Sequence, residues 1–125
     1  MLFLLCLSRA YIRYQLSDVA KGLCYIHSCN VTHGGLKGVC GCSRSHCTTV
    51  LTLNQSDILL DDSGHARIVD FGLATVTQNL DSILPTSLCG CAPRWTAPEV
   101  LLGGKRSMEG DIFSFAMVMV EARQG

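Results

Sequence analysis

The stretch "IVDFGLA", residues 68–74, is the most informative part of this sequence. Its β-branched Ile68 and Val69 favour a strand, and Gly72 lets the chain turn sharply just after it. An aspartate that directly follows a strand can present its carboxylate to a Mg²⁺ ion that bridges phosphate groups. Asp70 is therefore a candidate metal ligand, although three residues alone are a weak motif.

A hairpin is predicted around this stretch. The runs "DILL" (57–60) and "ARIVD" (66–70) are typical of strands, and "DDSG" (61–64) between them is typical of a turn. Further upstream, apolar residues recur at the i, i+3, i+4, i+7 spacing of one buried helix face: Leu16, Val19, Ala20, Leu23 and Ile26. That helix is expected to begin near Leu16, with Ser17 and Asp18 in its first turn or as a cap, and to break at Asn30.

The second half of the chain predicts loops and one apolar helix. Residues 75–96 lack a clear period and are expected to form a long loop, and "GGKRSMEG" (103–110) a second one. The run "DIFSFAMVMVEA" (111–122) is apolar nearly all round, which suits a helix buried within a larger domain. Because the sequence ends at Gly125, an exposed apolar patch on this helix is expected.

Four short motifs follow one another in order: "HGGLK" (33–37), "DFG" (70–72), "APE" (97–99) and "DIFSF" (111–115). With these motifs, residues 14–122 apart from 39–55 resemble the protein kinase family. "RWTAPEV" and "DIFSFAMVM" are similar to the tyrosine-kinase-like serine/threonine kinases. The resemblance implies a protein-kinase-like α+β fold for residues 1–125, as a partial kinase domain. This would be a truncated, mainly α-helical C-terminal lobe with a small β-hairpin and without the N-terminal lobe.

The resemblance also implies ATP and Mg²⁺ as cofactors and phosphoryl transfer to Ser or Thr of proteins. Asp70 would hold Mg²⁺ at the nucleotide phosphates, and Lys37 would contact the γ-phosphate. Asp57 stands where the family has an asparagine for a second Mg²⁺, thirteen residues ahead of Asp70 as in the family. His33, Glu99 and Asp111 would have structural roles: Asp111 would anchor the catalytic-loop backbone, and Glu99 would pair with an arginine outside this sequence.

Three positions depart from the family pattern. Gly35 stands where the family has the catalytic aspartate that accepts the proton of the substrate hydroxyl. A positioned base of this kind is worth about 10²–10⁴-fold in rate. Gly34 replaces an arginine that grips an activation-loop phosphate in many kinases, and Cys91 replaces a threonine that helps to seat the substrate hydroxyl.

The sequence also contains no Gly-rich phosphate loop and no "VAIK"-type lysine, the motifs of the small lobe. ATP binding is therefore expected to be weak. Three functions stay open: phosphoryl transfer that is impaired or lost, partner binding by a pseudokinase-like fragment, and a defective gene product with no independent role.

Residues 39–55 interrupt a motif that is continuous in the family, where "HGDLKGPNIL" runs without a break. Codons for Val39-Cys40 can match a 5′ splice signal and a codon for Gln55 can match a 3′ signal, so we hypothesise a translated intron. A zinc site is the alternative, since Cys40, Cys42, His46 and Cys47 are zinc-type ligands. Their crowded spacing differs from that of structural zinc sites, which favours a loop without metal.

Composition limits the kinds of binding partner and the cellular location that we expect. Ten basic residues balance ten acidic ones, which gives no electrostatic basis for binding nucleic acid or an anionic membrane. The apolar start "MLFLLCLSRA" is short and has no preceding Lys or Arg, unlike a signal peptide, and no run is long enough to span a bilayer. The expectation is a cytoplasmic protein whose eight cysteines are reduced, and whose protein substrate or partner is unknown.

Overall fold

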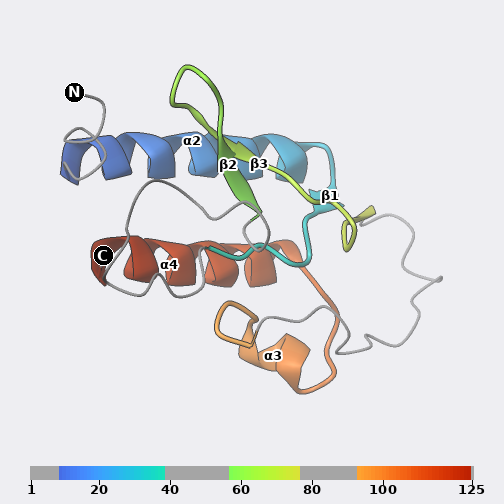
Figure 1. The fold of residues 1–125 in the computed structure, drawn as a ribbon. Helices are drawn as coiled ribbons and strands as arrows, with labels where there is room; N and C mark the ends of the chain where they lie inside the picture. The colour runs from blue at the N-terminus through green and yellow to red at the C-terminus, as the bar shows by residue number, and fades with distance from the viewer. Residues whose placement is uncertain (1–8, 39–56, 77–92, 125) are drawn as a thin grey trace.

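The computed structural model describes residues 9–38, 57–76 and 93–124 (Figure 1). Its elements in chain order are α2 (Arg9–Ser28), β1 (Val31–Thr32), β2 (Ile58–Leu60), β3 (Ala66–Ile68), β4 (Thr75–Val76), α3 (Pro98–Leu101) and α4 (Met108–Gln124). The strands form two antiparallel two-stranded sheets, β1 with β4 and β2 with β3. The described residues are therefore mainly helical with a small β part.

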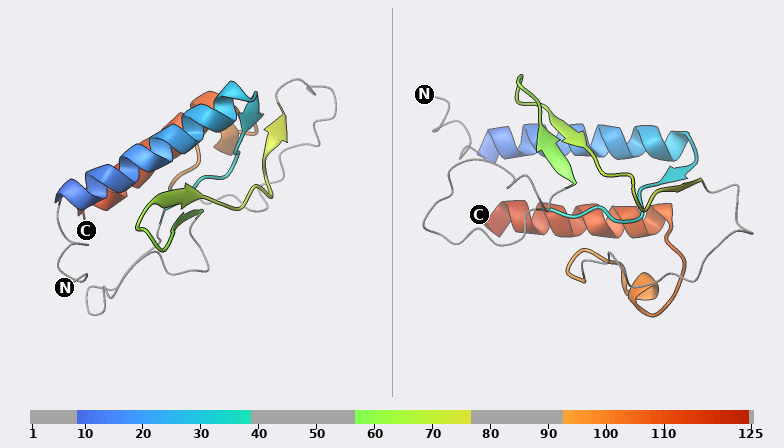
Figure 2. Two further views of the ribbon diagram at one scale, coloured as in Figure 1. Left: turned by 90° about the horizontal axis from the view of Figure 1, so that it is seen from above. Right: turned by 45° about the vertical axis from the view of Figure 1, so that its right-hand side comes forward.

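Helices α2 and α4 lie side by side and run in opposite directions (Figures 1 and 2). Val19 and Leu23 of α2 and Val118 of α4 belong to one hydrophobic core, which also includes Leu36 from the loop after β1. Leu36 is 1% exposed. Because burial of a leucine side chain is worth about 1.5–3 kcal/mol, Leu36 holds the loop from 33 to 38 against the helices.

The hairpin predicted from 57 to 70 is confirmed. β2 pairs with β3 in the register Ile58↔Ile68 and Leu60↔Ala66. The turn is closed by Gly64 N–H, which donates to the carbonyl of Asp61 at 2.8 Å. Gly64 has a φ of +83°, a conformation that costs other residues energy, and this explains the glycine there.

The start of α2 was predicted wrongly. The helix begins at Arg9 rather than near Leu16, so Ser17 and Asp18 lie in its middle. Asp18 does not cap the helix, since its Oδ2 accepts a hydrogen bond from Ala66 N–H at 3.3 Å and contacts His65 Nδ1 at 3.0 Å. The Asp18 carboxylate thus binds the hairpin and does not cap the helix. The predicted break is confirmed, since Asn30 has a φ of +57° directly after the helix.

The expected loop at 75–96 contains strand β4, which pairs with β1 in the register Val31↔Val76 and Thr32↔Thr75. Two-residue strands are too short to show a periodicity, so the sequence did not indicate either of them. Residues 77–92 lie outside the described part of the chain. The short helix α3 was also not predicted; it begins at Pro98, which is favourable at a first helical position.

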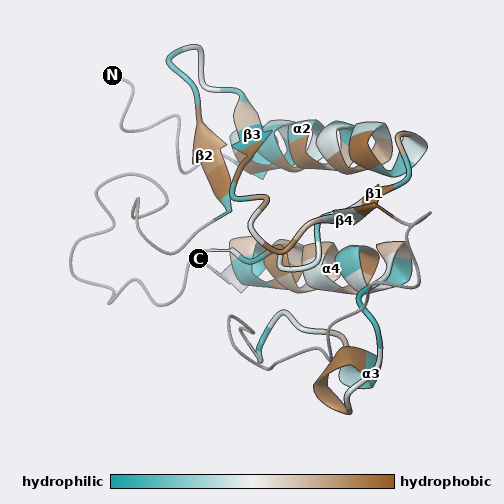
Figure 3. Ribbon diagram, turned by 90° about the vertical axis from the view of Figure 1, so that its right-hand side faces the viewer, coloured by the Kyte–Doolittle hydropathy of each residue, from teal (hydrophilic) through white to brown (hydrophobic). Residues whose placement is uncertain are grey.

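Helix α4 begins at Met108, three residues ahead of the predicted run. Its residues Asp111, Ser114 and Val118 are buried, and Ser114 Oγ donates to the carbonyl of Trp95 at 2.6 Å. On another side of the helix Ile112, Met119 and Val120 are exposed. Figure 3 shows hydrophobic residues on several turns of α4. The expected exposed apolar patch is therefore present, and α4 is buried on one face only.

Candidate functional site

The loop from 33 to 38 is held in place by one buried carboxylate. Asp111 is 2% exposed; its Oδ2 accepts from His33 N–H at 2.8 Å and its Oδ1 accepts from Gly34 N–H at 2.9 Å. This is the anchoring role that the resemblance implied for Asp111. His27 Nε2 lies 2.8 Å from the same Oδ2, so the end of α2 joins this contact. Sequence reasoning missed His27, because only the packing of α2 on α4 brings it to Asp111.

His33 links the loop to the end of the hairpin. Its ring is buried, and Nε2 lies 3.0 Å from the carbonyl oxygen of Val69, which can only accept. Nε2 therefore carries a proton, and Nδ1 accepts from Gly35 N–H at 3.4 Å. The ring of Phe71 meets the imidazole edge-on at 5.1 Å. His33 thus packs between the loop and the "DFG" turn, as expected for a structural residue.

The structure brings Lys37 and Asp57 together, although twenty positions separate them. Lys37 N–H donates to Asp57 Oδ2 at 3.1 Å, and Asp57 N–H donates to the carbonyl of Lys37 at 3.2 Å. Asp57 is 3% exposed, and its carbonyl accepts from Val69 N–H at 2.7 Å. Two candidate site residues are thereby fixed to each other and to the strand that leads to Asp70.

Burial raises the pKa of Asp57 to about 6, from an ordinary 3.8. The positive charge of Lys37 and the nearby His33 work against this rise, whereas the negative charge of Asp70 adds to it. The carboxyl of Asp57 therefore holds its proton more tightly than an ordinary aspartate does.

Asp70 differs from Asp57 because it is exposed. Its φ of +58° is uncommon for a residue with a side chain, though aspartate tolerates it better than most. Its Oδ1 accepts from Gly72 N–H at 3.2 Å, which closes the turn after β3. The geometry places this carboxylate at the surface, beside the half-exposed ring of Phe71.

The donor set suits Mg²⁺. This ion is commonly held in proteins by one or two carboxylates together with waters and substrate phosphates, so Asp57 and Asp70 are chemically sufficient. Within residues 9–38, 57–76 and 93–124, no group of three or more His, Cys, Asp or Glu could hold a metal ion. Among these described residues the candidate ligands are thus two carboxylates, a donor type that Mg²⁺ accepts.

Gly34 and Gly35 differ in how readily a side chain could replace their hydrogen. Gly34 has a φ of +79°, and a Cβ there would lie 2.6 Å from the carbonyl oxygen of Leu73. The three atoms nearest to a Cβ at Gly35 would all belong to the side chain of Leu73, with Cδ1 at 2.8 Å. The backbone thus demands glycine at 34, whereas position 35 could accept a side chain if Leu73 moved. Leu73 was not singled out by the sequence, since its contact with Gly35 depends on how the turn after β3 folds back.

A small cavity of about 20 Å³ lies beneath the two glycines. Its walls include Leu36, Arg106 and Asp111. This volume accommodates about one water molecule, so the cavity is not a substrate pocket.

Other residues from the sequence analysis are not part of this site. Glu99 is exposed, and its carbonyl accepts from Gly104 N–H at 2.7 Å. Five candidates lie outside the described residues: Cys40, Cys42, His46, Cys47 and Cys91. Cys24 and Cys29 are exposed free thiols. No helix in the described parts of the chain is long and apolar enough to cross a membrane.

Comparison with known proteins agrees with the resemblance. The sequence model described as protein tyrosine and serine/threonine kinase matches residues 51–125. A probable serine/threonine-protein kinase of Dictyostelium discoideum is 32% identical over 114 residues, which is 91% of this chain and 6% of that protein. Serine/threonine-protein kinase 12 of Arabidopsis thaliana is 34% identical over 115 residues, 91% of this chain and 21% of that protein. Mitogen-activated protein kinase kinase kinase 17 of the same plant is 32% identical over 108 residues, 86% of this chain and 23% of that protein.

Proposed function

This chain belongs to the protein tyrosine and serine/threonine kinase family, and on that basis we propose that it carries the phosphate-facing part of a kinase C-terminal lobe that has lost phosphoryl transfer. The chain spans between 6% and 23% of the length of the three relatives described above. Those relatives are named as serine/threonine or mitogen-activated kinases, which supports Ser or Thr of proteins as the ancestral acceptor.

One observation carries the proposal: no carboxylate is available at position 35. The attacking hydroxyl needs a group that orients it and accepts its proton. Gly35 has no such group, and the space beside it is taken by Leu73, whose Cδ1 lies 2.8 Å from where a Cβ would be. Loss of the base alone lowers the rate by about 10²–10⁴-fold. An apolar side chain at that point also works against seating a hydroxyl.

Binding of a Mg²⁺-nucleotide is the activity that the remaining residues support. Asp70 and Asp57 would hold the metal, and Lys37 would contact the terminal phosphate. A bound Mg²⁺ would neutralise phosphate charge and relieve the repulsion between the two carboxylates. Asp57 brings one more negative charge than the asparagine of the family, which strengthens its attraction for the metal and weakens that for the phosphates. We expect weak, Mg²⁺-dependent binding.

Residues 39–55 are proposed to be an insertion that the fold does not need. The two reciprocal hydrogen bonds between Lys37 and Asp57 support this view, because they join the chain on either side of the insertion. The coding DNA tests the intron hypothesis directly: codons that lack the splice-like sequences at its two ends would contradict it.

Binding of a fluorescent ATP analogue to the 125-residue chain tests the proposal. We expect an anisotropy rise with Mg²⁺ that disappears with excess EDTA and in Asp70→Ala. The matched control is Asp62→Ala, an exposed aspartate in the turn between β2 and β3, which should bind like the native chain. Nucleotide binding that is equal in Asp70→Ala and Asp62→Ala would refute the metal assignment.

Transfer of labelled γ-phosphate to a mixed serine/threonine peptide library tests the second half of the proposal. We expect incorporation no greater than that of Asp70→Ala. Incorporation by the native chain that is lost in Asp70→Ala would overturn the inferred inactivity. The fluorescence of Trp95, the only tryptophan, should show a cooperative urea transition, and its absence would favour the reading as a defective gene product.

A further inference from the structure

A second concave surface lies on the chain, between α2 and β3. This groove has a volume of about 330 Å³ and is lined by Asp18, Lys21, Gly22, Tyr25, His65, Ala66, Arg67 and Ile68. None of these residues is one of the candidate nucleotide-site residues Lys37, Asp57 and Asp70. The proposed function therefore does not use the groove.

The floor of the groove is apolar. Ala66 is buried, and Ile68 packs so closely on α2 that its Cδ1 lies 3.0 Å from where a Cβ at Gly22 would be. A side chain at Gly22 would require the end of the Ile68 side chain to shift. The glycine therefore allows close packing of Ile68 on α2.

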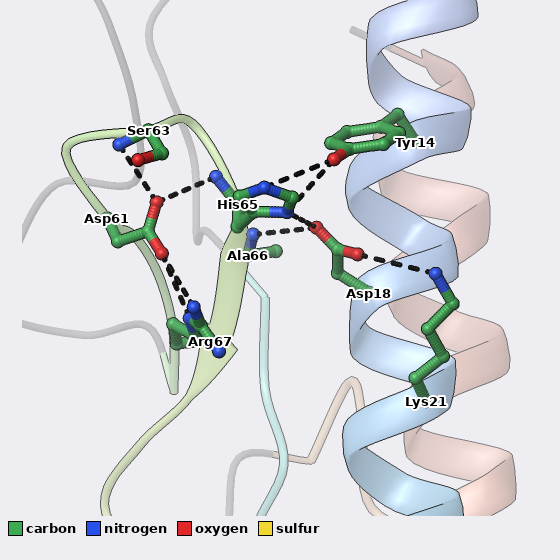
Figure 4. A network of polar contacts seen from close by, with 8 residues as sticks. All are labelled: Tyr14, Asp18, Lys21, Asp61, Ser63, His65, Ala66 and Arg67. Atoms are coloured by element: carbon green, nitrogen blue, oxygen red, sulfur yellow. Dashed lines mark hydrogen bonds and ion pairs between the residues drawn. The ribbon is translucent and has the colours of Figure 1, made fainter.

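A polar network fixes one end of the groove (Figure 4). The ring of His65 lies between Tyr14 and Asp18, with Tyr14 Oη 3.0 Å and Asp18 Oδ2 3.0 Å from Nδ1. Asp18 Oδ2 also accepts from Ala66 N–H at 3.3 Å. The single carboxylate in the lining of the groove is therefore occupied by contacts within the protein.

The two cations of the lining are much more accessible. The Lys21 side chain is 74% exposed, and its Nζ is 3.8 Å from Asp18 Oδ1, a loose surface pair that costs little to open. The Arg67 side chain is 66% exposed and uses Nε and Nη2 to contact Asp61 Oδ2 at 3.0 and 2.9 Å. A guanidinium has five N–H donors, so further donors are available to a ligand. Lys21 comes from α2 and Arg67 from β3, so a positive group stands on each wall.

Tyr25 adds an aromatic ring at the rim, and it is 70% exposed. Exposed tyrosines and arginines are enriched in protein interfaces, where they bury both apolar area and a polar group. The volume is at the small end of the range of about 300–1,000 Å³ for ligand sites, and it suits one or two side chains of an extended peptide. Two accessible cations over an apolar floor complement a segment in which acidic and aliphatic residues alternate.

We propose that the groove between α2 and β3 is a docking site for an acidic segment of a partner protein. A carboxylate of the segment pairs with Lys21 and Arg67, and a neighbouring aliphatic side chain rests on Ile68 beside the ring of Tyr25. This assigns the chain an interaction surface that does not depend on phosphoryl transfer.

Fluorescence anisotropy with a labelled octapeptide that alternates glutamate and leucine tests this assignment on the full 125-residue chain. We expect saturable binding that weakens about tenfold in Lys21→Glu and falls between about 50 and 300 mM salt. The matched control is Arg13→Glu, the same charge reversal at an exposed site of α2 outside the groove, which should change the affinity less than twofold. An octapeptide of glutamate and serine should bind more weakly, because it lacks the aliphatic side chains.

Four results would overturn the assignment. They are equally tight binding of an octapeptide that alternates lysine and leucine, equal losses in Lys21→Glu and Arg13→Glu, no saturable binding up to about 1 mM peptide, and self-association of the chain that Lys21→Glu abolishes. The last result would assign the groove to a second copy of this chain. Circular dichroism checks that Lys21→Glu retains its helices, and Lys21→Gln takes its place if it does not.

Discussion

Replacing Asp57 by asparagine should stabilise this protein near neutral pH. Asp57 is almost completely buried, and burial raises its pKa to about 6 from 3.8. The folded state therefore binds a proton more tightly than the unfolded state does. Stability from this group is fully present below pH 3.8 and is lost as the pH rises through about 6. Asparagine has nearly the same shape and no charge, so it removes this pH-dependent loss.

The size of the effect follows from the difference between the two pKa values. Each pKa unit corresponds to about 1.4 kcal/mol, so the rise from 3.8 to about 6 amounts to about 3 kcal/mol above pH 7. The amide oxygen of asparagine can still accept the hydrogen bond that Lys37 N–H now donates to Oδ2 at 3.1 Å. The hydrogen bond is kept and the buried charge is removed, so the gain in unfolding free energy at pH 7.5 should approach that value.

Urea unfolding followed by Trp95 fluorescence at pH 4.0, 5.0, 6.0 and 7.5 measures the effect. The advantage of Asp57→Asn should be near zero at pH 4.0 and should grow steadily to pH 7.5. Asp61→Asn is the control of opposite sign: the backbone N–H of His65 holds the pKa of Asp61 below its ordinary value, so this change should destabilise the chain at pH 7.5. An advantage of Asp57→Asn that is equal at all four pH values, or absent at pH 7.5, would refute the reasoning.

Three further predictions concern the loop and its supports. Gly34→Ala should lower the unfolding free energy by about 1–3 kcal/mol, because it forces a side chain into a positive-φ position against the carbonyl of Leu73. Gly35→Ala should cost less, because the side chain of Leu73 can turn away. Equal urea midpoints for the two variants would contradict this. Asp111→Ala should cost about 3 kcal/mol or more, because it leaves the buried N–H of His33 and the partly buried N–H of Gly34 without their acceptor. A cost below about 1 kcal/mol in urea unfolding would argue against the anchoring role. Deleting 39–55 should leave the chain folded and raise its unfolding free energy by about 2 kcal/mol, because a shorter loop loses less entropy when it closes. A loss of cooperative unfolding would show that the segment is needed.

The hairpin and the buried face of the first helix could be predicted because their signals are local. Strand-like runs on either side of "DDSG" define the hairpin, and the spacing of Leu16, Val19 and Leu23 defines the helix face. The helix start could not be predicted in the same way. Asp18 looks like a first-turn residue, but its carboxylate serves the backbone of Ala66 in the hairpin. The partner of a polar residue in the middle of a helix depends on tertiary contacts, which the local sequence does not reveal.

The candidate site likewise has features that could be predicted from the sequence and features that depend on the folded structure. The order of short motifs was enough to identify the family and to point to Lys37, Asp57 and Asp70, because each motif is defined by residue type and spacing. The raised pKa of Asp57 is a property of the folded state, since it arises from burial and from charges that are distant in sequence.

Sequence by itself therefore determined that this protein belongs to the kinase family, and it placed Gly35 where the resemblance puts the catalytic aspartate, because both depend on which residue stands at which position. Only the tertiary structure showed that Leu73 fills the space beside Gly35 and that Asp111 anchors the loop from 33 to 38. It also showed that α2 and β3 enclose a groove with Lys21 and Arg67 on its walls. These features require atoms from distant parts of the chain to meet, and their distances are fixed by the packing of α2, α4 and the hairpin around one core.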